Sequence, residues 1–330
     1  MRIAVTGSIA TDHLMAYPGR FVEQLIADRL DRVSLSFLAD DLEVRFGGVA
    51  ANIALGLSRL GITSVLAGAA GKDFGEYGTW LEENGVDTSS VHRSETLHTA
   101  RFVCTTDLDL NQIATFYAGA MAEAGRITLA SVQERAGELG LAVIAPNDPG
   151  AMLSLTEESR RLGIPFAADP SQQLARLDGP QTRLLVDGAR FLFTNEYEAA
   201  LLQERTGWSI EEVLRRTGVW VITRGAAGAD IGRSGEPWLH VPAVPTESIA
   251  DPTGVGDAFR SGFLAAVAWG LPYEQAARLG CALATVVLQV VGTQTYELTP
   301  ADLLLSIDRT YGAEAARAFQ PHLAAASTTG

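Results

Sequence analysis

Short apolar runs alternate with longer helical patterns along most of this 330-residue chain, and this alternation limits the possible folds more than any other feature. The apolar runs predict six strands, over residues 3–6, 64–67, 141–145, 166–169, 191–194 and 219–223. The helical patterns lie between them, over residues 50–60, 76–84, 157–162, 196–205 and 210–216. Strand–helix alternation at this spacing predicts an α/β fold, a central and mostly parallel sheet with helices on both faces. In such sheets ligands bind beyond the carboxyl ends of the strands.

Two segments interrupt the alternation, because each contains strand patterns with no helix between them. They are residues 33–38 with 43–46, and residues 99–106 with 112–117. We interpret them as a small antiparallel β layer that serves as a lid, a dimer surface or both. No repeat or linker divides the chain, so we predict a single domain over residues 1–330, with lid strands inserted at about 11–47 and 97–119. The last hundred residues are predicted to be mostly helical, and Pro272 suits the first turn of a helix.

Composition excludes several classes of protein. The chain has 39 acidic and 25 basic residues and a formal net charge of −14, which argues against a general nucleic-acid binder. Backbone amides and Mg²⁺ can still hold a nucleotide within an acidic protein. The apolar stretches are too short to span a membrane, and no secretory segment is visible, so no membrane partner is expected. Two cysteines, Cys104 and Cys281, make no disulfide framework, so we expect a cytoplasmic protein.

The strongest chemical signal is the segment 251–259, which reads DPTGVGDAF and opens an apolar helical pattern. Its glycines allow a tight turn in which the N–H groups of Gly254, Val255, Gly256 and Asp257 point at one spot near a helix N-terminus. That arrangement forms an anion hole. Asp257 would place a carboxylate beside it, where a general base can accept the proton of an attacking hydroxyl in phosphoryl transfer. The alternative is a surface turn, but the apolar helix that follows favours the anion hole.

Two further signals each have a structural alternative. Gly47 and Gly48 precede a helix, with Asn52 one turn in, which permits close backbone approach to a ligand or simply a tight strand-to-helix turn. Asn195 and Glu198 follow a predicted strand and share one face of a helix start. An ordinary N-cap with acidic residues in the first turn would look the same.

Together these motifs resemble the ribokinase-like, or PfkB, family of sugar and nucleoside kinases over nearly the whole chain. The resemblance extends to residues 68–75, which read GAAGKDFG. Family members more often carry Thr where this chain has Pro252 and Ala where it has Val255, and neither change removes an expected N–H donor. The resemblance implies a ribokinase-like fold, ATP as co-substrate and Mg²⁺ ordered through water by Asn195 and Glu198. It also implies a monovalent cation such as K⁺ beside Asp251.

Within the family, residues 5–14, 33–38 and 168–176 resemble the adenosine kinases of actinobacteria. This resemblance implies transfer of the ATP γ-phosphoryl group to the 5′-hydroxyl of adenosine, giving AMP in purine salvage. It also implies that Ser8 and Ser36 contact the substrate. The ATP base is expected near residues 223–225 and 291–292, so that Asn195, Thr223, Gly225 and Gly256 bind ATP.

The acceptor side can be argued from residue types. Asp12 follows the first strand, and a carboxylate accepts from two vicinal hydroxyls at once, as on a ribose held further by Asn52 and Gly48. Phe102 and Phe116 lie on the lid strands and can stack on the two faces of a purine. We expect Gln172 and Gln173, after the strand that ends at Asp169, to contact the purine or ribose. Alternatively, Asp12 caps a turn and the two rings pack in the lid's own core.

Two other functions stay open at this stage. One is a sugar kinase for ribose, fructose or a related substrate, or a kinase of another nucleoside, with the same catalytic end. The other is a nucleotide-binding regulator, which would normally lack Asp257, Gly254 or Gly256, and all three are present. The expected partners are small-molecule substrates and a second copy of the chain, in a homodimer formed through the lid strands.

Overall fold

A twisted eight-stranded sheet forms the centre of the computed structural model, which describes residues 1–24 and 35–326. Its strand order is β14-β13-β12-β11-β10-β9-β1-β4, and the strands from β12 to β4 are all parallel. The strands are β1 (Ile3–Thr6), β4 (Ser64–Ala67), β9 (Leu141–Ile144), β10 (Phe166–Ala168), β11 (Phe191–Asn195), β12 (Val219–Thr223), β13 (Ala229–Gly232) and β14 (Leu239–Val241). Only β13 and β14 run antiparallel to their neighbours, at one edge. All parallel strands therefore end at the same edge of the sheet.

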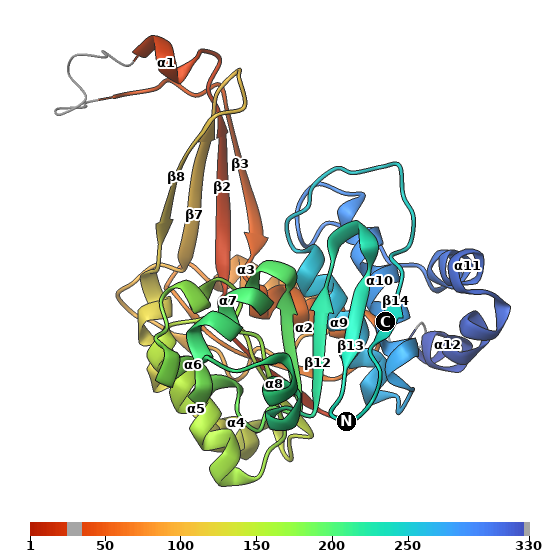
Figure 1. Ribbon diagram of the computed structural model, residues 1–330. Coiled ribbons are helices and arrows are strands. Elements are labelled where there is room, and N and C mark those ends of the chain that lie inside the picture. Colours follow the sequence, from red (N-terminus) through yellow and green to blue (C-terminus); the bar gives the residue numbers. More distant parts are fainter. Residues whose placement is uncertain (25–34, 327–330) are drawn as a thin grey trace.

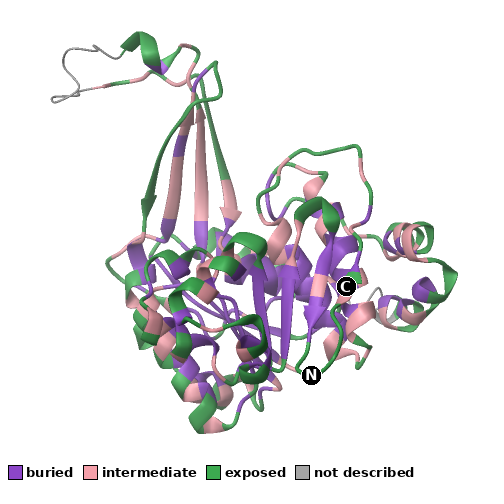
Figure 2. Ribbon diagram, viewed as in Figure 1, coloured by how far each residue is buried: buried purple, intermediate pink, exposed green. Residues whose placement is uncertain are grey.

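Helices cover both faces of this sheet and close two separate hydrophobic cores (Figures 1 and 2). One face carries α2 (Val49–Arg59), α3 (Gly75–Glu83), α9 (Val255–Ala268), α10 (Tyr273–Leu288), α11 (Pro300–Tyr311) and α12 (Ala313–Ala326). The other carries α4 (Leu129–Ala136), α5 (Pro149–Leu162), α6 (Gly179–Val186), α7 (Glu196–Thr206) and α8 (Ile210–Arg216). Helices α9 and α10 pack closely because each has a glycine where they cross, Gly262 on α9 and Gly280 on α10. A Cβ on Gly262 would lie only 2.9 Å from the Cα of Gly280.

Four strands form a second sheet that stands away from the body (Figure 1). They are β2 (Ala10–Ala16), β3 (Asp41–Gly47), β7 (Ala100–Thr106) and β8 (Gln112–Tyr117), in the order β3-β2-β7-β8, and we call them the lid. The outer pairs are antiparallel and the central pair, β2 with β7, is parallel. In the lid, β2, β3 and β7 are buried where they meet the body, and Cys104 is also buried midway along β7, while β8 is exposed throughout (Figure 2).

Several short elements lie outside the two larger sheets and the long helices. At the outer end of the lid lies the short helix α1 (Phe21–Gln24), whose Phe21 ring packs on Tyr17 and Phe37. A two-stranded sheet joins β5 (Ala69–Ala70) and β6 (His92–Arg93). Three short 3₁₀ segments are η2 (Gly119–Arg126), η3 (Ser171–Ala175) and η4 (Gly225–Ala227). In the part of the chain that the structure describes, no helix is both long enough and apolar enough to cross a membrane.

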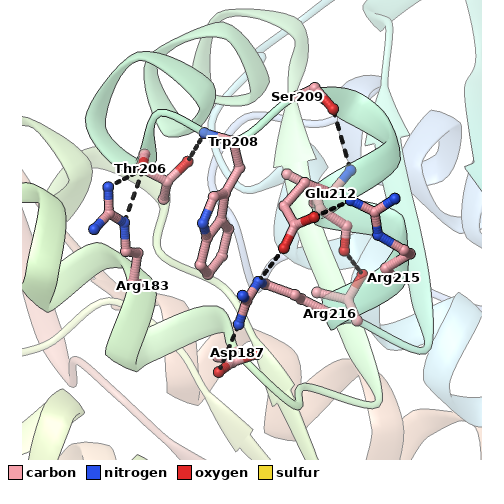
Figure 3. Close-up of polar contacts among 10 residues, drawn as sticks. Arg183, Asp187, Thr206, Trp208, Ser209, Glu212, Arg215 and Arg216 are labelled. Atoms are coloured by element: carbon pink, nitrogen blue, oxygen red, sulfur yellow. Dashed lines mark hydrogen bonds and ion pairs between the residues drawn. The ribbon is translucent and has the colours of Figure 1, made fainter.

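Arginines join the outer helices α6, α7 and α8 (Figure 3). Arg183 of α6 donates through Nε to the carbonyl oxygen of Thr206, the last residue of α7, at 2.8 Å. The guanidinium of Arg216 lies 4.7 Å from the ring centre of Trp208 and pairs with Asp187 and Glu212. These arginines therefore satisfy helix carbonyls and neighbouring carboxylates, and none of them lines the cavities described below.

The predicted α/β class is confirmed, and the six predicted strands all occur with ends within one residue of those expected. Several elements were missed. Helix α5 begins at Pro149, eight residues before the predicted start, because Asp148 caps it and Pro149 suits its first turn. Helices α4 and α6 and strands β13 and β14 were not predicted. Strand β2 was missed because both of its faces are half-exposed, so no polar–apolar alternation marks it.

The strand predicted over residues 33–38 is wrong where it can be compared. Residues 35–38 form no ladder, and residues 33 and 34 lie outside the described part. The Phe37 ring lies 4.9 Å from the rings of Tyr17 and Phe21, so aromatic packing rather than strand pairing holds this segment. Asp12, expected just past the carboxyl end of the first strand, lies within β2, so the alternative in which it caps a turn is wrong.

Candidate active site

Three cavities lie in a row along the carboxyl edge of the main sheet. The first has a volume of about 590 Å³ and lies between the sheet and the lid. The second, of about 520 Å³, shares Gly254 and Asp257 with the first. The third, of about 600 Å³, shares Thr223, Gly225 and Gly256 with the second. One carboxylate, that of Asp257, thus faces two adjoining cavities.

One row of side chains crosses the lid and faces the first cavity. Strand register pairs Arg45 with Asp12, Asp12 with Phe102, and Phe102 with Phe116. Residues opposite one another on neighbouring strands share a face, and all four line the cavity. Phe102 is half-buried and Phe116 is 52% exposed, so the two rings do not pack in a core of the lid.

The floor of the first cavity comes from the body. Ser8 follows β1, and its Oγ accepts a hydrogen bond from the N–H of Val49 at 3.0 Å, which fixes the start of α2. Gln172 and Gln173 of η3 line the opposite side. Gln173 is 6% exposed, and its Oε1 has no protein partner among the described residues. The remaining predicted acceptor residues, Gly48 and Asn52, also line this cavity.

Helix α9 opens with the predicted turn. Gly254 is its N-cap with φ +75°, a left-handed conformation that glycine adopts without strain, and it offers no side-chain cap. The N–H groups of the first turn, from Val255 onward, are left without the helical partners that later residues have. A Cβ at Gly254 would lie 2.7 Å from Cγ2 of Thr293, so space also requires glycine here. The turn therefore provides donors for an anion at the shared wall of the second and third cavities.

Asp257 sits in the first turn of α9 and is held by Asn52 of α2. The Asn52 Nδ2 donates to Oδ2 of Asp257 at 2.8 Å. Burial raises the pKa of Asp257 to about 6, while the nearby Arg260 and the Asn52 hydrogen bond act in the opposite direction. A carboxyl group with this pKa is largely ionised at neutral pH and can still accept a proton.

Asn52 is itself fixed by a buried hydrogen-bond network. Its Oδ1 accepts from Oγ1 of Thr293 and from Nε2 of Gln294, both at 2.9 Å. Gln294 also donates to the hydroxyl of Tyr77 at 2.6 Å, and that hydroxyl donates to the carbonyl oxygen of Gly47 at 2.8 Å. The amide of Asn52 can therefore present only its Nδ2 to Asp257.

An ion pair lines the second cavity beneath the anion turn. Arg260 lies one turn after Asp257 on α9, and its NH2 is 2.5 Å from Oδ1 of Asp169, which follows β10. Burial raises the pKa of Asp169 to about 7 even though Arg260 lowers it, and the charges of Glu198 and Asp257 raise it further.

The predicted metal residues Asn195 and Glu198 also line the second cavity, where they cap α7. The Asn195 side chain accepts from the N–H of Glu198, and the Glu198 carboxylate accepts from the N–H of Asn195, both at 2.8 Å. This is the N-cap alternative of the sequence analysis, and it leaves Oε1 of Glu198 facing Ser171 at 3.2 Å. Among the described residues, no group of three His, Cys, Asp or Glu side chains forms a direct metal site. Glu198 and the unpartnered Oδ2 of Asp169 suit an ion that keeps most of its waters, as Mg²⁺ does.

Asp251, predicted beside a monovalent cation, stabilises the loop in which it lies. Its carboxylate accepts from the N–H groups of Thr253 at 2.9 Å and Gly292 at 3.1 Å, and it lies 3.7 Å from NH1 of Arg45. These contacts lower the pKa of Asp251 against the effect of burial. The K⁺ site stays a prediction.

The third cavity is mainly apolar. Its walls come from β12 and η4, from the loop before α9, and from α9 and α10, including Val244, Ile249, Val255, Phe259 and Leu288. Thr223 and Gly225, predicted to bind ATP, lie where it opens to the second cavity. A flat aromatic base fits such a wall, and polar groups at the cavity mouth can orient it.

The structure brings together every predicted site residue except Ser36, which is exposed and outside the three cavities. Sequence reasoning missed several others: Arg45, Met121 and Arg176 in the first cavity, Asp169 and Arg260 in the second, and Thr293 behind Asn52. Arg260 carried a detectable signal, since it lies three residues after Asp257 in a predicted helix. Thr293 carried none, because its contact with Asn52 spans 241 residues.

This fold and site belong to a known class of phosphotransferases. Residues 6–300 match the pfkB family of carbohydrate kinases, and the chain belongs to this family. A nucleoside kinase of Methanothermobacter thermautotrophicus is 34% identical over 76% of this chain and 80% of its own. The solved structure of Burkholderia thailandensis nucleoside kinase in complex with inosine is 34% identical, covers 94% of this chain and 98% of its own, and superposes with a TM-score of 0.81. An adenosine kinase of Schizosaccharomyces pombe is 40% identical, but over only 44% of this chain and 47% of its own.

The Asn52–Asp257 hydrogen bond predicts how the carboxyl group titrates. We expect the carboxyl carbon signal of Asp257, followed by NMR, to titrate with a midpoint near pH 6. Asn52→Ala removes a donor that favours the ionised form, so the midpoint should move to higher pH. Asp257→Asn identifies the signal. A midpoint near 3.8 in both proteins would contradict the burial and the hydrogen bond described here.

Proposed function

We propose that this protein is an adenosine kinase that transfers the γ-phosphoryl group of ATP to the 5′-hydroxyl of adenosine. The observation that carries the proposal is the position of Asp257 at the junction of the first two cavities. A phosphoryl transfer needs an acceptor on one side of the base and a phosphate chain on the other. The row of three cavities offers the nucleoside, the phosphates and the ATP base one cavity each.

The reaction follows from this arrangement. Asp257 accepts the proton of the 5′-hydroxyl while the oxygen forms its bond to the γ-phosphorus. The bond from that phosphorus to the β,γ-bridging oxygen breaks, and the electron pair stays with ADP. The N–H groups of Gly254, Val255 and Gly256 donate to the phosphoryl oxygens as their charge redistributes. Glu198, Asn195 and Asp169 would hold Mg²⁺ through water, and the ion would supply positive charge to the phosphates.

The lid supports a nucleoside rather than a free sugar. Asp12 stands beside Phe102 in the row that faces the first cavity. A carboxylate next to an aromatic ring suits a ribose joined to a base, because the first accepts from the 2′- and 3′-hydroxyls and the second stacks on the purine. Gln173 adds a buried amide on the opposite wall. A sugar alone would leave both phenylalanine rings without a ligand to stack on.

The acceptor is tested by comparing substrates. We expect ADP release from magnesium ATP to be fastest with adenosine, and slower with inosine, guanosine, 2′-deoxyadenosine, ribose and fructose. Inosine belongs in this panel because the Burkholderia thailandensis kinase was solved with it. Asp257→Asn should lower kcat with every acceptor by about 10²–10⁴-fold, as expected for loss of a general base.

Each outcome of the comparison has a distinct meaning. A higher kcat/KM for ribose or fructose would replace the nucleoside proposal with a sugar kinase. A higher value for inosine or guanosine would keep the nucleoside class and change the base. An Asp257→Asn protein with wild-type kcat would remove this residue from the proposed mechanism.

Substitution of the lid phenylalanines tests whether their rings stack on the nucleoside base or only pack within the lid. We expect Phe102→Ala and Phe116→Ala each to raise KM for adenosine about 5–150-fold, equivalent to the roughly 1–3 kcal/mol of a stacked base, with little change in KM for ATP. Asp12→Ala should act the same way through the ribose. Exposed Tyr197 lines only the second cavity, so Tyr197→Ala is a matched aromatic control for adenosine KM. Folded Phe variants with unchanged KM for adenosine would contradict stacking.

We also propose that two copies of the chain associate through their lids. The outer face of the lid, opposite the first cavity, carries exposed apolar side chains on its two edge strands: Leu42 and Val44 on β3, and Ile113 and Tyr117 on β8. A second copy would cover this surface with the same side chains, in the self-complementary manner of a two-fold dimer.

The dimer predicts a mass near twice 35.0 kDa in sedimentation equilibrium. Val44→Glu with Ile113→Glu should shift the protein toward the monomer, because each change buries a charge in the proposed interface. Leu305→Glu is the control, since Leu305 is equally exposed but lies on α11, outside the lid. A wild-type protein that sediments as a monomer would rule the dimer out.

A further inference from the structure

Arg260 is a buried cation at the phosphate end of the site, with no part in the reaction described above. It is 7% exposed, and it lines the second cavity together with Asp257 and the glycines of the anion turn. Arginine is rarely buried to this extent unless it is paired. The ion pair of Arg260 therefore identifies the group that holds its guanidinium. The guanidinium N–H groups outside that pair are available to a ligand.

Asp169 holds one end of the guanidinium. The contact joins NH2 of Arg260 to Oδ1 of Asp169 at 2.5 Å, and Asp169 is fully buried. The pair does not use all its polar atoms, because Nε of Arg260 and Oδ2 of Asp169 have no partner within the described residues. Replacing a buried ion pair by apolar residues is often neutral or stabilising, so stability alone is a weak reason for this pair.

The other end of the guanidinium lies against the anion turn. A Cβ built on Gly256 would be only 2.8 Å from NH1 of Arg260. NH1 therefore lies beside Gly256 of the anion turn, and both line the second cavity. Any larger residue at position 256 would displace it, which links the glycine and the arginine physically.

The acidic residues around the second cavity also favour a role for Arg260 in binding phosphates. Asp169, Glu198 and Asp257 all contribute negative charge near Arg260, and these carboxylates raise the pKa of the guanidinium against the effect of burial. A phosphate chain entering this cavity would meet these three carboxylates and that of Glu196, which also lines it. Among the described residues that line this cavity, Arg260 is the only Lys or Arg.

We propose that Arg260 is a further catalytic residue, whose NH1 contacts the γ-phosphoryl group during transfer while Asp169 holds the guanidinium in position. Bond formation and cleavage are those given above, with the proton going to Asp257 and the electron pair to ADP. Arg260 exchanges no proton. Its guanidinium donates hydrogen bonds to the phosphoryl oxygens as their charge develops in the transition state. A planar guanidinium with several N–H groups suits this role better than a lysine ammonium does.

This inference rests on phosphoryl transfer by the family, and it does not depend on adenosine as the acceptor. We expect Arg260→Gln to lower the pH-independent plateau of kcat by about 10²–10³-fold, comparable to the loss of one oxyanion donor. Because Arg260 lowers the pKa of Asp257, the acid limb of the kcat/KM profile should also move to higher pH. An arginine that acts only on Asp257 would shift the limb and leave the plateau unchanged.

Two variants guard against a purely structural effect. Arg260→Gln leaves Asp169 buried without its partner, so the double change Asp169→Asn with Arg260→Gln removes both charges and keeps an amide pair. Arg183→Gln is the matched control, because it also removes an arginine that is bonded within the protein (Figure 3) but that lines none of the three cavities. We expect the double variant to fold with the lowered plateau, and the control to keep wild-type kcat. A folded double variant with wild-type kcat would overturn the proposal.

A binding measurement makes the test independent of the acceptor. Aluminium fluoride with magnesium ADP mimics the transferring phosphoryl group, and calorimetry gives its affinity. Arg260→Gln should bind magnesium ADP with an affinity within about twofold of wild type. Aluminium fluoride should raise that affinity at least tenfold less in the variant than in the wild-type protein. If the variant keeps that gain, Arg260 does not contact the phosphoryl group. Failure of adenosine in the substrate panel would leave this result unaffected.

Discussion

The hydrogen bond from Asn52 to Asp257 joins the two halves of this molecule at the point where chemistry is proposed. Asn52 lies on α2, next to the glycine pair that ends a lid strand, and Asp257 lies on α9 at the anion turn. The partners are 205 residues apart in sequence. Thr293, Gln294 and Tyr77 fix the Asn52 amide through buried hydrogen bonds, so protein contacts hold the Asp257 carboxylate at the wall that the first two cavities share.

This hydrogen-bond network reaches the lid as well as the proposed general base, Asp257. The Tyr77 hydroxyl donates to the carbonyl oxygen of Gly47, the last residue of β3, and the Tyr77 ring stacks on Phe46 with 4.3 Å between centroids. Tyr77 is 2% exposed, so these contacts are buried. Three hydrogen bonds therefore connect the lid to the residue that holds Asp257: Gly47 to Tyr77, Tyr77 to Gln294, and Gln294 to Asn52. At its outer end the lid has a separate buried contact, in which the N–H of Phe21 donates to Asp107 at 2.9 Å, while β8 is exposed along its length (Figure 2).

Electrostatics explains why the site needs both burial and arginine. Burial raises the pKa of Asp257 to about 6 and of Asp169 to about 7, and without neighbouring cations both groups would be harder still to ionise. Arg260 opposes this effect at the phosphate end. At the acceptor end Arg45 lies close to Asp12 and Asp251 and does the same for Asp12, whose pKa is raised by burial. Each carboxylate of the site thus has a cation within reach, in a protein whose net charge is −14.

Sequence by itself determined the α/β class, the strand positions and the anion turn, because these depend on local patterns. Apolar runs of strand length, and two glycines with a carboxylate at the start of an apolar helical pattern, are visible along the chain. Only the tertiary structure decided which residues face one another. Asp12 proved to be part of a lid strand whose half-exposed faces carry no periodic signal, and the partners of Asn52 and Arg260 come from distant segments. Contacts of this kind follow from how helices pack on a sheet, and no spacing within the sequence records them.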